Sequence, residues 1–247
     1  MFGMMELKSG VQLPALGLGT WRMGEEHNDK ATEIAAIHRA IDLGLTHIDT
    51  AEMYGDGATE DLVGTAIADR REGLFLTSKV YPWNAGQTEM IPACESSLRR
   101  LGTDHIDLYL LHWPGSIDFA ETLEAAERLK RDGKIGAFGI SNFDRRGIDR
   151  IVDAGQDGPV EVNQVMYNPA RRGIEFDLLP RLDELNIATV AYTPIEPAKL
   201  DAHPQFVALA SDIGLTPVEL ALAWHMTIHQ LTDPIAQCEF RMTTELG

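Results

Sequence analysis

The sequence is poor in cysteine and in long hydrophobic runs. Its 247 residues include two cysteines, Cys94 and Cys238, which form no C-x-x-C pair. This scarcity excludes a disulfide-rich miniprotein, and free thiols in a reducing cytoplasm are the simplest interpretation. No apolar run approaches the roughly 18 residues that a membrane span needs. Residues 1–10 contain Glu6 and Lys8 and have no apolar signal core, so we expect them to belong to the fold.

Positive charge is also scarce. The chain has 21 lysine and arginine residues against 38 aspartate and glutamate residues, a net charge of −17. A protein of that charge repels nucleic acid and anionic lipid, which argues against both as partners. Apolar residues make up 44% of the chain, as in a globular protein with a sizeable core. Its length fits one (β/α)₈ barrel or one doubly wound sheet, and we predict a single domain over residues 1–247.

Short apolar runs alternate with helical patterns along most of the chain. Each run is short enough to be a strand buried on both faces, and strands separated by helices form a parallel sheet. The runs are residues 16–21, 46–51, 74–80, 106–113, 137–142, 160–167 and 188–195. Before them, residues 6–13 predict a β-hairpin that turns at Ser9 and Gly10. Periodicity alone does not decide between a barrel and an open sheet.

Between the runs, apolar residues recur every three or four positions, as on one face of a helix. Such faces occur in residues 34–41, 91–101, 119–126 and 148–152. Thr88 is a candidate N-cap for the second of these helices, and Gly102 is its stop signal. Thr216 and Glu219 have the spacing of a capping box, with Pro217 at the first helical position, which predicts a further helix.

Polar residues at the ends of the apolar runs are candidates for chemistry, because barrel active sites lie at the carboxyl ends of the strands. Asp49 lies near the end of the second run and Lys79 near the end of the third. A charge inside an apolar strand is costly unless it is paired, which predicts a buried Asp49–Lys79 ion pair. Tyr54 follows in a loop and His112 lies near the end of the fourth run. Their convergence on one end favours a catalytic centre over a purely structural pair.

Seven short motifs occur in order and at a characteristic spacing from about Leu13 to Trp224. They are Gly17-Leu-Gly-Thr-Trp21, Asp49-Thr-Ala-Glu-Met-Tyr54-Gly55, Ser78-Lys79-Val80, Leu111-His112-Trp113, Gly139-Ile-Ser-Asn142, Asn163-Gln164 and Ala191-Tyr192-Thr-Pro194. This series resembles the signature of the aldo-keto reductases. Residues 49–54 and 79–84 further resemble a bacterial branch of small-aldehyde reductases that includes methylglyoxal reductases. The resemblance implies an α/β fold, a (β/α)₈ TIM barrel, which binds NADPH without the G-x-G-x-x-G of a Rossmann domain.

The resemblance implies an enzyme that reduces small aldehydes or ketoaldehydes by hydride transfer from NADPH. Tyr54 would be the general acid. A free phenol titrates near pH ~10, and a neighbouring Lys79 ammonium would lower that pKa. Asp49 would keep Lys79 charged and in place, and His112 would donate a hydrogen bond to the substrate oxygen.

The resemblance also assigns residues to the cofactor and to the substrate. The NADPH contacts would be Thr20, Asp49, Ser141, Asn142, Gln164 and Tyr192, with the Tyr192 ring stacked on the nicotinamide. The walls of the substrate pocket would be Trp21, Met53, Trp83 and Trp113. His225 and His229 have a metal-like spacing, but no glutamate or third ligand accompanies them, so we predict no metal site. Arg99 and Arg100 are expected on a solvated helix face.

After about Gln230 the sequence departs from the family pattern. The residues with which the family grips the adenosine 2′-phosphate have no counterpart, and Arg241 is the one lysine or arginine after Trp224. Pro234–Cys238 is the candidate for an eighth strand, but we expect the last strand and the closing helix to be incomplete, which would expose strand edges at the barrel seam. Without charge-assisted bonds to the phosphate, we also expect weaker cofactor binding and a smaller preference for NADPH over NADH.

Two alternative functions stay open. The divergent end favours a cofactor-poor or inactive homologue that acts as a binding or scaffold protein. A barrel isomerase or lyase could use Lys79 as a Schiff-base amine, although pairing with Asp49 argues against a free amine. The sequence does not decide between a monomer and a homodimer, and the expected partner is a small carbonyl compound.

Overall fold

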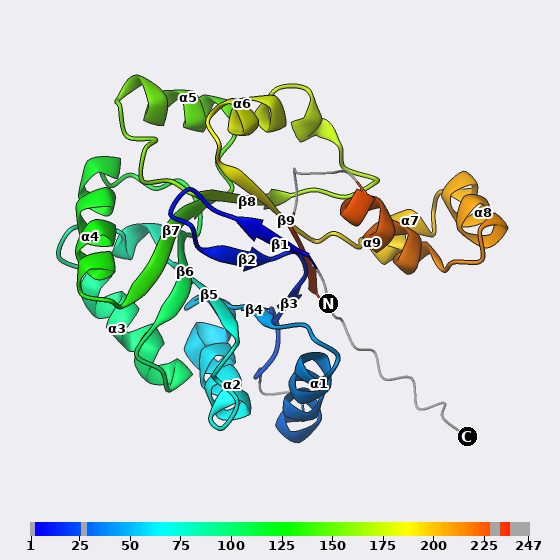
Figure 1. Cartoon of the computed structure of the whole chain (residues 1–247), viewed down its shortest axis with the longest axis horizontal. Coiled ribbons are helices and arrows are strands. Elements are labelled where there is room, and N and C mark those ends of the chain that lie inside the picture. The colour runs from blue at the N-terminus through cyan, green and yellow to red at the C-terminus, as the bar shows by residue number, and fades with distance from the viewer. Residues whose placement is uncertain (1–2, 26–28, 228–232, 238–247) are drawn as a thin grey trace.

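Eight parallel strands close into a barrel in the computed structural model, which describes residues 3–25, 29–227 and 233–237 (Figure 1). The strand order around the barrel is β10-β3-β4-β5-β6-β7-β8-β9. The strands are β3 (Gly17–Gly19), β4 (His47–Asp49), β5 (Phe75–Val80), β6 (Ile106–Leu111), β7 (Ile135–Ser141), β8 (Val162–Met166), β9 (Ala188–Tyr192) and β10 (Asp233–Gln237). The predicted TIM barrel is therefore confirmed. Six of the seven apolar runs contain a barrel strand, and the run 137–142 overlaps β7, which begins two residues earlier.

The helices cover the outside of the barrel, as Figure 1 shows, and three of them extend to one side. The surrounding helices are α1 (Lys30–Asp42), α2 (Ala58–Ile67), α3 (Met90–Leu101), α4 (Phe119–Arg131), α5 (Arg145–Asp153) and α6 (Leu178–Glu184). The helices at the side are α7 (Pro197–Leu200), α8 (Pro204–Asp212) and α9 (Pro217–Thr227). One apolar face of each surrounding helix packs on the strands, and this layer contains most of the hydrophobic core.

Helix ends follow the sequence signals in two of three cases. Gly102 ends α3 in the left-handed conformation, with φ of 63°. The capping box at the start of α9 forms, because Thr216 Oγ accepts from the Glu219 N–H and Glu219 accepts from the Thr216 N–H. Thr88 is not the N-cap of α3: Glu89 holds that position and makes no capping side-chain bond.

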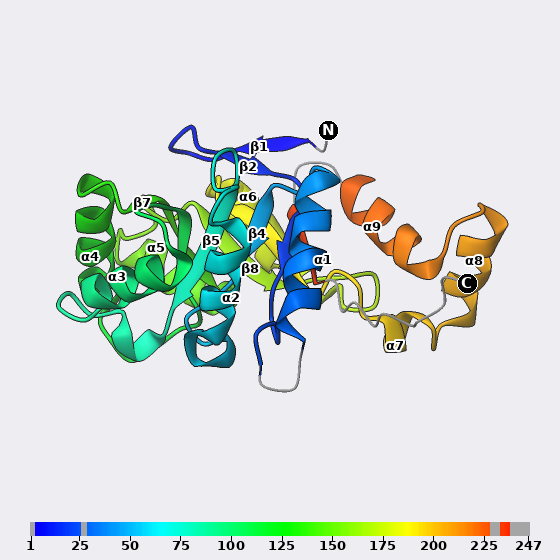
Figure 2. The ribbon, with the colours of Figure 1, turned by 90° about the horizontal axis from the view of Figure 1, so that it is seen from below.

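The predicted hairpin closes the amino-terminal end of the barrel. Strands β1 (Met4–Glu6) and β2 (Gln12–Pro14) pair antiparallel, and Figure 2 shows them lying across that end. Leu7 and Leu13 pack on residues inside the barrel, including Leu108 and Leu110. Ser9 donates to Glu161 through both its N–H and its hydroxyl, which holds the turn in place. The opposite, carboxyl-terminal end of the barrel is not covered by the hairpin, and the candidate active site lies there.

Strand β10 corrects the expectation of an incomplete barrel. It pairs with β3, where Ile235 lies opposite Gly17, and with β9, where Asp233 lies opposite Val190. The strand edges at the seam are therefore paired, and closure comes from a segment whose Asp-Pro start is a poor strand signal. The expected loss of a closing helix concerns residues beyond 237, which lie outside the described part of the chain, as do Cys238 and Arg241.

Within the described residues, no single helix has the length and hydropathy to cross a membrane. Helices α8 and α9 meet that criterion only together, as a pair bent by 83°.

Candidate active site

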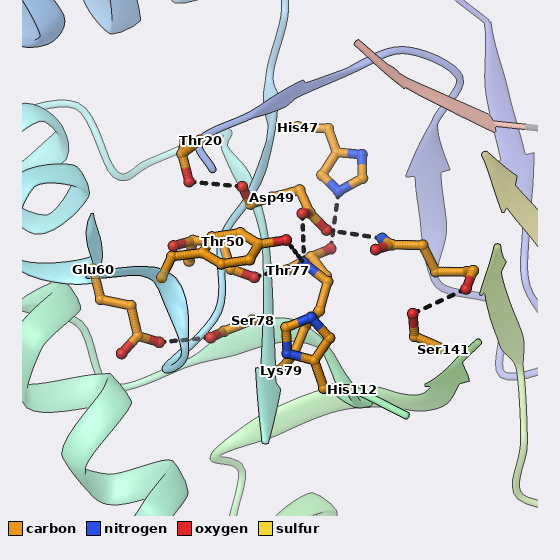
Figure 3. Close-up of polar contacts among 12 residues, drawn as sticks. Thr20, His47, Asp49, Thr50, Glu60, Thr77, Ser78, Lys79, His112 and Ser141 are labelled. Carbon is orange, nitrogen blue, oxygen red and sulfur yellow. Dashed lines mark hydrogen bonds and ion pairs between the residues drawn. The ribbon is translucent and has the colours of Figure 1, made fainter. Parts of the chain in front are cut away.

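Lys79 lies inside the barrel, and its ammonium group is surrounded by oxygen atoms (Figure 3). Its Nζ lies 2.6 Å from Asp49 Oδ1 and donates to the Thr50 carbonyl at 2.8 Å and to Tyr54 Oη at 3.1 Å. The side chain is 1% exposed, and that of Asp49 is 5% exposed. Three acceptors satisfy the three donors of the ammonium, so the buried charge keeps its hydrogen bonds. The predicted buried ion pair is confirmed.

The turn after β4 directs Tyr54 back toward Lys79. Tyr54 begins a short 3-10 helix, Tyr54–Gly57, in which Gly55, Asp56 and Gly57 all have positive φ (55°, 55° and 92°). Glycine adopts that region without strain, and aspartate is among the residues that tolerate it best. The Gly-Asp-Gly sequence therefore permits a tight reversal that leaves the Tyr54 ring buried, with its hydroxyl on the ammonium.

His112 follows β6 and lies beside the Tyr54 ring. The two ring centroids are 5.8 Å apart in an edge-to-face arrangement. Burial and the Lys79 charge lower the pKa of His112 to about 3. The imidazole is therefore neutral near pH 7, and a neutral imidazole carries one N–H donor.

The charges around Tyr54 do not act as simply as the sequence suggests. Burial raises the pKa of Tyr54, and the opposing effect of Lys79 is smaller, so the pKa lies above its usual value. Lys79 lowers the Tyr54 pKa as predicted, and burial, which the sequence did not show, outweighs it. For Lys79, burial lowers the pKa, but Asp49 and Tyr54 together raise it above the usual value. The resting site therefore holds a protonated phenol against a charged amine.

Hydroxyl and amide groups gather at the ends of β7 and β8. Gln164 Nε2 donates to Asp49 Oδ2 at 2.9 Å, so the carboxylate contacts both Lys79 and Gln164. Ser141 Oγ donates to the main-chain carbonyl of Gln164 at 2.9 Å, and Asn142 Nδ2 lies 3.1 Å from Ser141 Oγ. Tyr192, at the end of β9, donates its hydroxyl to Asn142 Oδ1 at 2.8 Å. The four residues predicted for the nicotinamide end are thus one connected group.

Thr20 and the four residues predicted for the substrate pocket differ in how deeply they are buried. Thr20 is fully buried and donates through Oγ1 to the Asp49 carbonyl at 2.8 Å, which joins the ends of β3 and β4. Trp83 and Trp113 contact each other, with ring centroids 5.8 Å apart. Met53 is half-buried beside Tyr54 in the chain. Trp21 is 45% exposed, and the Arg22 guanidinium carbon lies over its ring, 4.5 Å from the ring centroid.

Arg100 corrects the expectation of a solvated helix face. Its guanidinium pairs with Glu60, at 2.5 Å from Nη2 and 2.7 Å from Nε. Glu60 is fully buried on α2 and also accepts from Ser78 Oγ at 2.6 Å, on the outward face of β5. A Cβ added to Gly57 would lie 2.7 Å from Arg100, so the arginine packs against the turn that carries Tyr54.

Comparison with known proteins agrees with this geometry. The family model described as the aldo/keto reductase family matches residues 15–239. The chain belongs to the aldo/keto reductase family. Methylglyoxal reductase YeaE of Escherichia coli K12 is 49% identical over 195 residues, which cover 79% of this chain and 69% of that protein.

Two solved aldo-keto reductase structures from Klebsiella pneumoniae are each 42% identical and cover 96% of this chain and 85% of theirs. One is a complex with NADP and acetate, with a TM-score of 0.89. The other is a complex with NADPH, with a TM-score of 0.86. The predicted family is therefore confirmed.

The described residues contain no cluster of three or more potential metal ligands. His225 is buried among aromatic rings, while His229 lies outside the described part of the chain. Cys94 is a buried free thiol whose pKa is raised to about 12 by burial, which leaves it unreactive as a nucleophile.

The Glu60–Arg100 pair gives a direct stability prediction for this aldo-keto reductase. Arg100→Met should destabilise the fold by about 3–5 kcal/mol, because it leaves the Glu60 carboxylate buried without its cation. Arg99→Met is the matched control. Arg99 is the preceding residue on α3 and is exposed, so its loss should change stability by no more than about 0.5 kcal/mol. Urea unfolding of the two variants near pH 7 measures the difference, and equal midpoints would contradict the packing described above.

Proposed function

We propose that this protein reduces small aldehydes and ketoaldehydes to alcohols with NADPH, and that Tyr54 is the general acid. The observation that supports the proposal most strongly is the contact of the Tyr54 hydroxyl with the Lys79 ammonium, which Asp49 holds at 2.6 Å. The similarity to a methylglyoxal reductase makes methylglyoxal the natural first substrate to test.

The group at the ends of β7, β8 and β9 fits the cofactor. Ser141, Asn142 and Gln164 offer one hydroxyl and two amides, which match the donor and acceptor of a carboxamide. The Tyr192 ring is half-buried beside them and can cover one face of a flat heterocycle. NADPH, when bound, supplies the hydride. The chain's own contribution is to bind, to orient and to deliver the proton.

Tyr54 donates the proton that the substrate oxygen needs. Because burial keeps its pKa above the usual value, the phenol is protonated before reaction. Proton loss leaves a phenolate 3.1 Å from Lys79, and the ammonium stabilises that charge through a direct hydrogen bond. Asp49 and the Thr50 carbonyl hold the ammonium in place, so little reorganisation accompanies the transfer.

His112 acts as a neutral hydrogen-bond donor to the same substrate oxygen. Its ring lies against Tyr54, so one oxygen atom can approach both groups. Asn142 Nδ2 donates to the His112 carbonyl at 3.0 Å, which ties the position of the histidine to the cofactor group. Two donors on one oxygen polarise the carbonyl and stabilise developing negative charge.

The two alternatives are less well supported. A Schiff-base mechanism needs a neutral amine, but Asp49 and Tyr54 raise the pKa of Lys79 above its usual value. The inactive-homologue interpretation rested on the divergent end of the chain. The pairing of β10 on both sides removes the expected gap in the barrel, and the residues after 237, where the family binds the 2′-phosphate, lie outside the described part of the chain. The buried free thiol of Cys94 is compatible with a reducing compartment, and we propose a cytoplasmic location.

Removing the Tyr54 hydroxyl tests the proposal. Tyr54→Phe should lower kcat for methylglyoxal by about 10²- to 10⁴-fold, the usual contribution of a general acid, while NADPH binding is retained. The rate is followed by loss of the nicotinamide absorbance. Tyr109→Phe is the control, because it removes a phenol hydroxyl that lies in the hydrophobic core and makes no hydrogen bond there to any described residue. A Tyr54→Phe enzyme as fast as the wild type would remove Tyr54 from the role of acid.

The low pKa of His112 predicts the pH profile. A histidine of ordinary pKa, 6.5, would lose its neutral form as the pH falls through that value. With its pKa lowered to about 3, His112 stays neutral, so kcat/KM should show no inflection from this residue between about pH 5 and 8. Rates measured across that range check the prediction. A fall centred near 6.5 that disappears in His112→Asn would contradict it.

A further inference from the structure

A buried carboxylate, Glu52, has no part in the mechanism above. It is 8% exposed and lies in the turn between Asp49 and Tyr54. Its Oε1 accepts from the Tyr81 N–H at 2.5 Å and from Asn84 Nδ2 at 3.2 Å. Its own N–H donates to the Lys79 carbonyl at 3.3 Å. Burial raises the pKa of Glu52, because a charged carboxylate is less stable away from water.

The segment that Glu52 holds is aromatic. Tyr81 and Trp83 stack with ring centroids 4.3 Å apart and planes 20° apart. The ring centroids of Trp83 and Trp113 are 5.8 Å apart, and those of Trp113 and His112 are 4.8 Å apart. His112 in turn lies 5.8 Å from Tyr54. A continuous row of rings therefore runs from the proposed general acid to the outer edge of the site; we call Tyr81, Trp83 and Trp113 the aromatic wall.

The outer part of the aromatic wall lies at the protein surface. Trp83 is 60% exposed and lies in a single 3-10 turn, Pro82–Asn84. Glu52 binds both sides of that turn, through the backbone of Tyr81 before it and the side chain of Asn84 at its end. Since Glu52 is two residues from Tyr54, one carboxylate fixes the distance between the wall and the proposed acid.

We propose that Glu52 is a positioning residue that determines substrate specificity, by holding the aromatic wall where a flat apolar substrate body stacks while its carbonyl reaches Tyr54 and His112. This inference rests on the proposed function and adds the substrate class that the site prefers. A compact ketoaldehyde reaches Tyr54 without crossing the wall. An aromatic aldehyde gains stacking area along Trp113 and Trp83, and aromatic contacts add to affinity beyond simple burial.

The test is the ratio of kcat/KM for naphthaldehyde to kcat/KM for methylglyoxal, both measured with NADPH. Glu52→Ala should lower this ratio on the order of tenfold, mainly through a higher KM for naphthaldehyde, because the wall is no longer aligned. Glu52→Gln is the matched control. It keeps an oxygen that accepts from Tyr81 and Asn84, so the ratio should stay near that of the wild type. A general loss of stability lowers both rates and leaves the ratio unchanged.

Each outcome decides the inference. A normal ratio in folded Glu52→Ala overturns it and leaves the proposed function intact. If Glu52→Ala does not fold, Asn84→Ala removes one of the two contacts, and it should lower the ratio about threefold; an unchanged ratio overturns the inference in the same way. A wild-type protein that reduces neither aldehyde with NADPH contradicts the proposed function, and the inference fails with it.

Discussion

The positive charge of Lys79, held inside the barrel away from water, is the constraint on which the site depends. An unpaired ammonium there would be strongly destabilising, so the surrounding strands must present acceptors to it. Asp49, the Thr50 carbonyl and Tyr54 fill that requirement. The same contacts that make the charge tolerable also place a phenol hydroxyl on it, so the structural need and the proposed chemistry use one set of atoms.

Contacts around the Asp49–Lys79 pair hold the turn that carries Tyr54 and the neighbouring groups in place. The turn that carries Tyr54 is bounded on one side by Arg100, which pairs with the buried Glu60. On the other side, Glu52 connects the same turn to Tyr81 and Asn84. Gln164 connects Asp49 to the group at the ends of β7 and β8. The proposed proton donor, cofactor group and aromatic wall are therefore joined by hydrogen bonds or ion pairs, which favours preorganisation of the site.

The sequence allowed the barrel strands and the Asp49–Lys79 pair to be predicted, because charged residues in apolar runs need partners and parallel strands end together. It did not reveal α2, because the Gly55-Asp56-Gly57 turn before it has the composition of a loop. The role of Arg100 was hidden because its partner lies 40 residues away in the chain. The direction of the Tyr54 pKa depends on the balance between burial and charge, which only the three-dimensional arrangement provides.

The most direct measurement of the central claim is the pKa of Tyr54, followed by carbon-13 NMR of protein labelled at tyrosine Cζ and assigned with Tyr54→Phe. The double variant Lys79→Met/Asp49→Asn removes both charges without leaving either buried alone. Because Lys79 lowers the Tyr54 pKa more than Asp49 raises it, ionisation of Tyr54 should begin at a higher pH in the double variant than in the wild type. An unchanged or lower pKa in the folded variant would contradict the account.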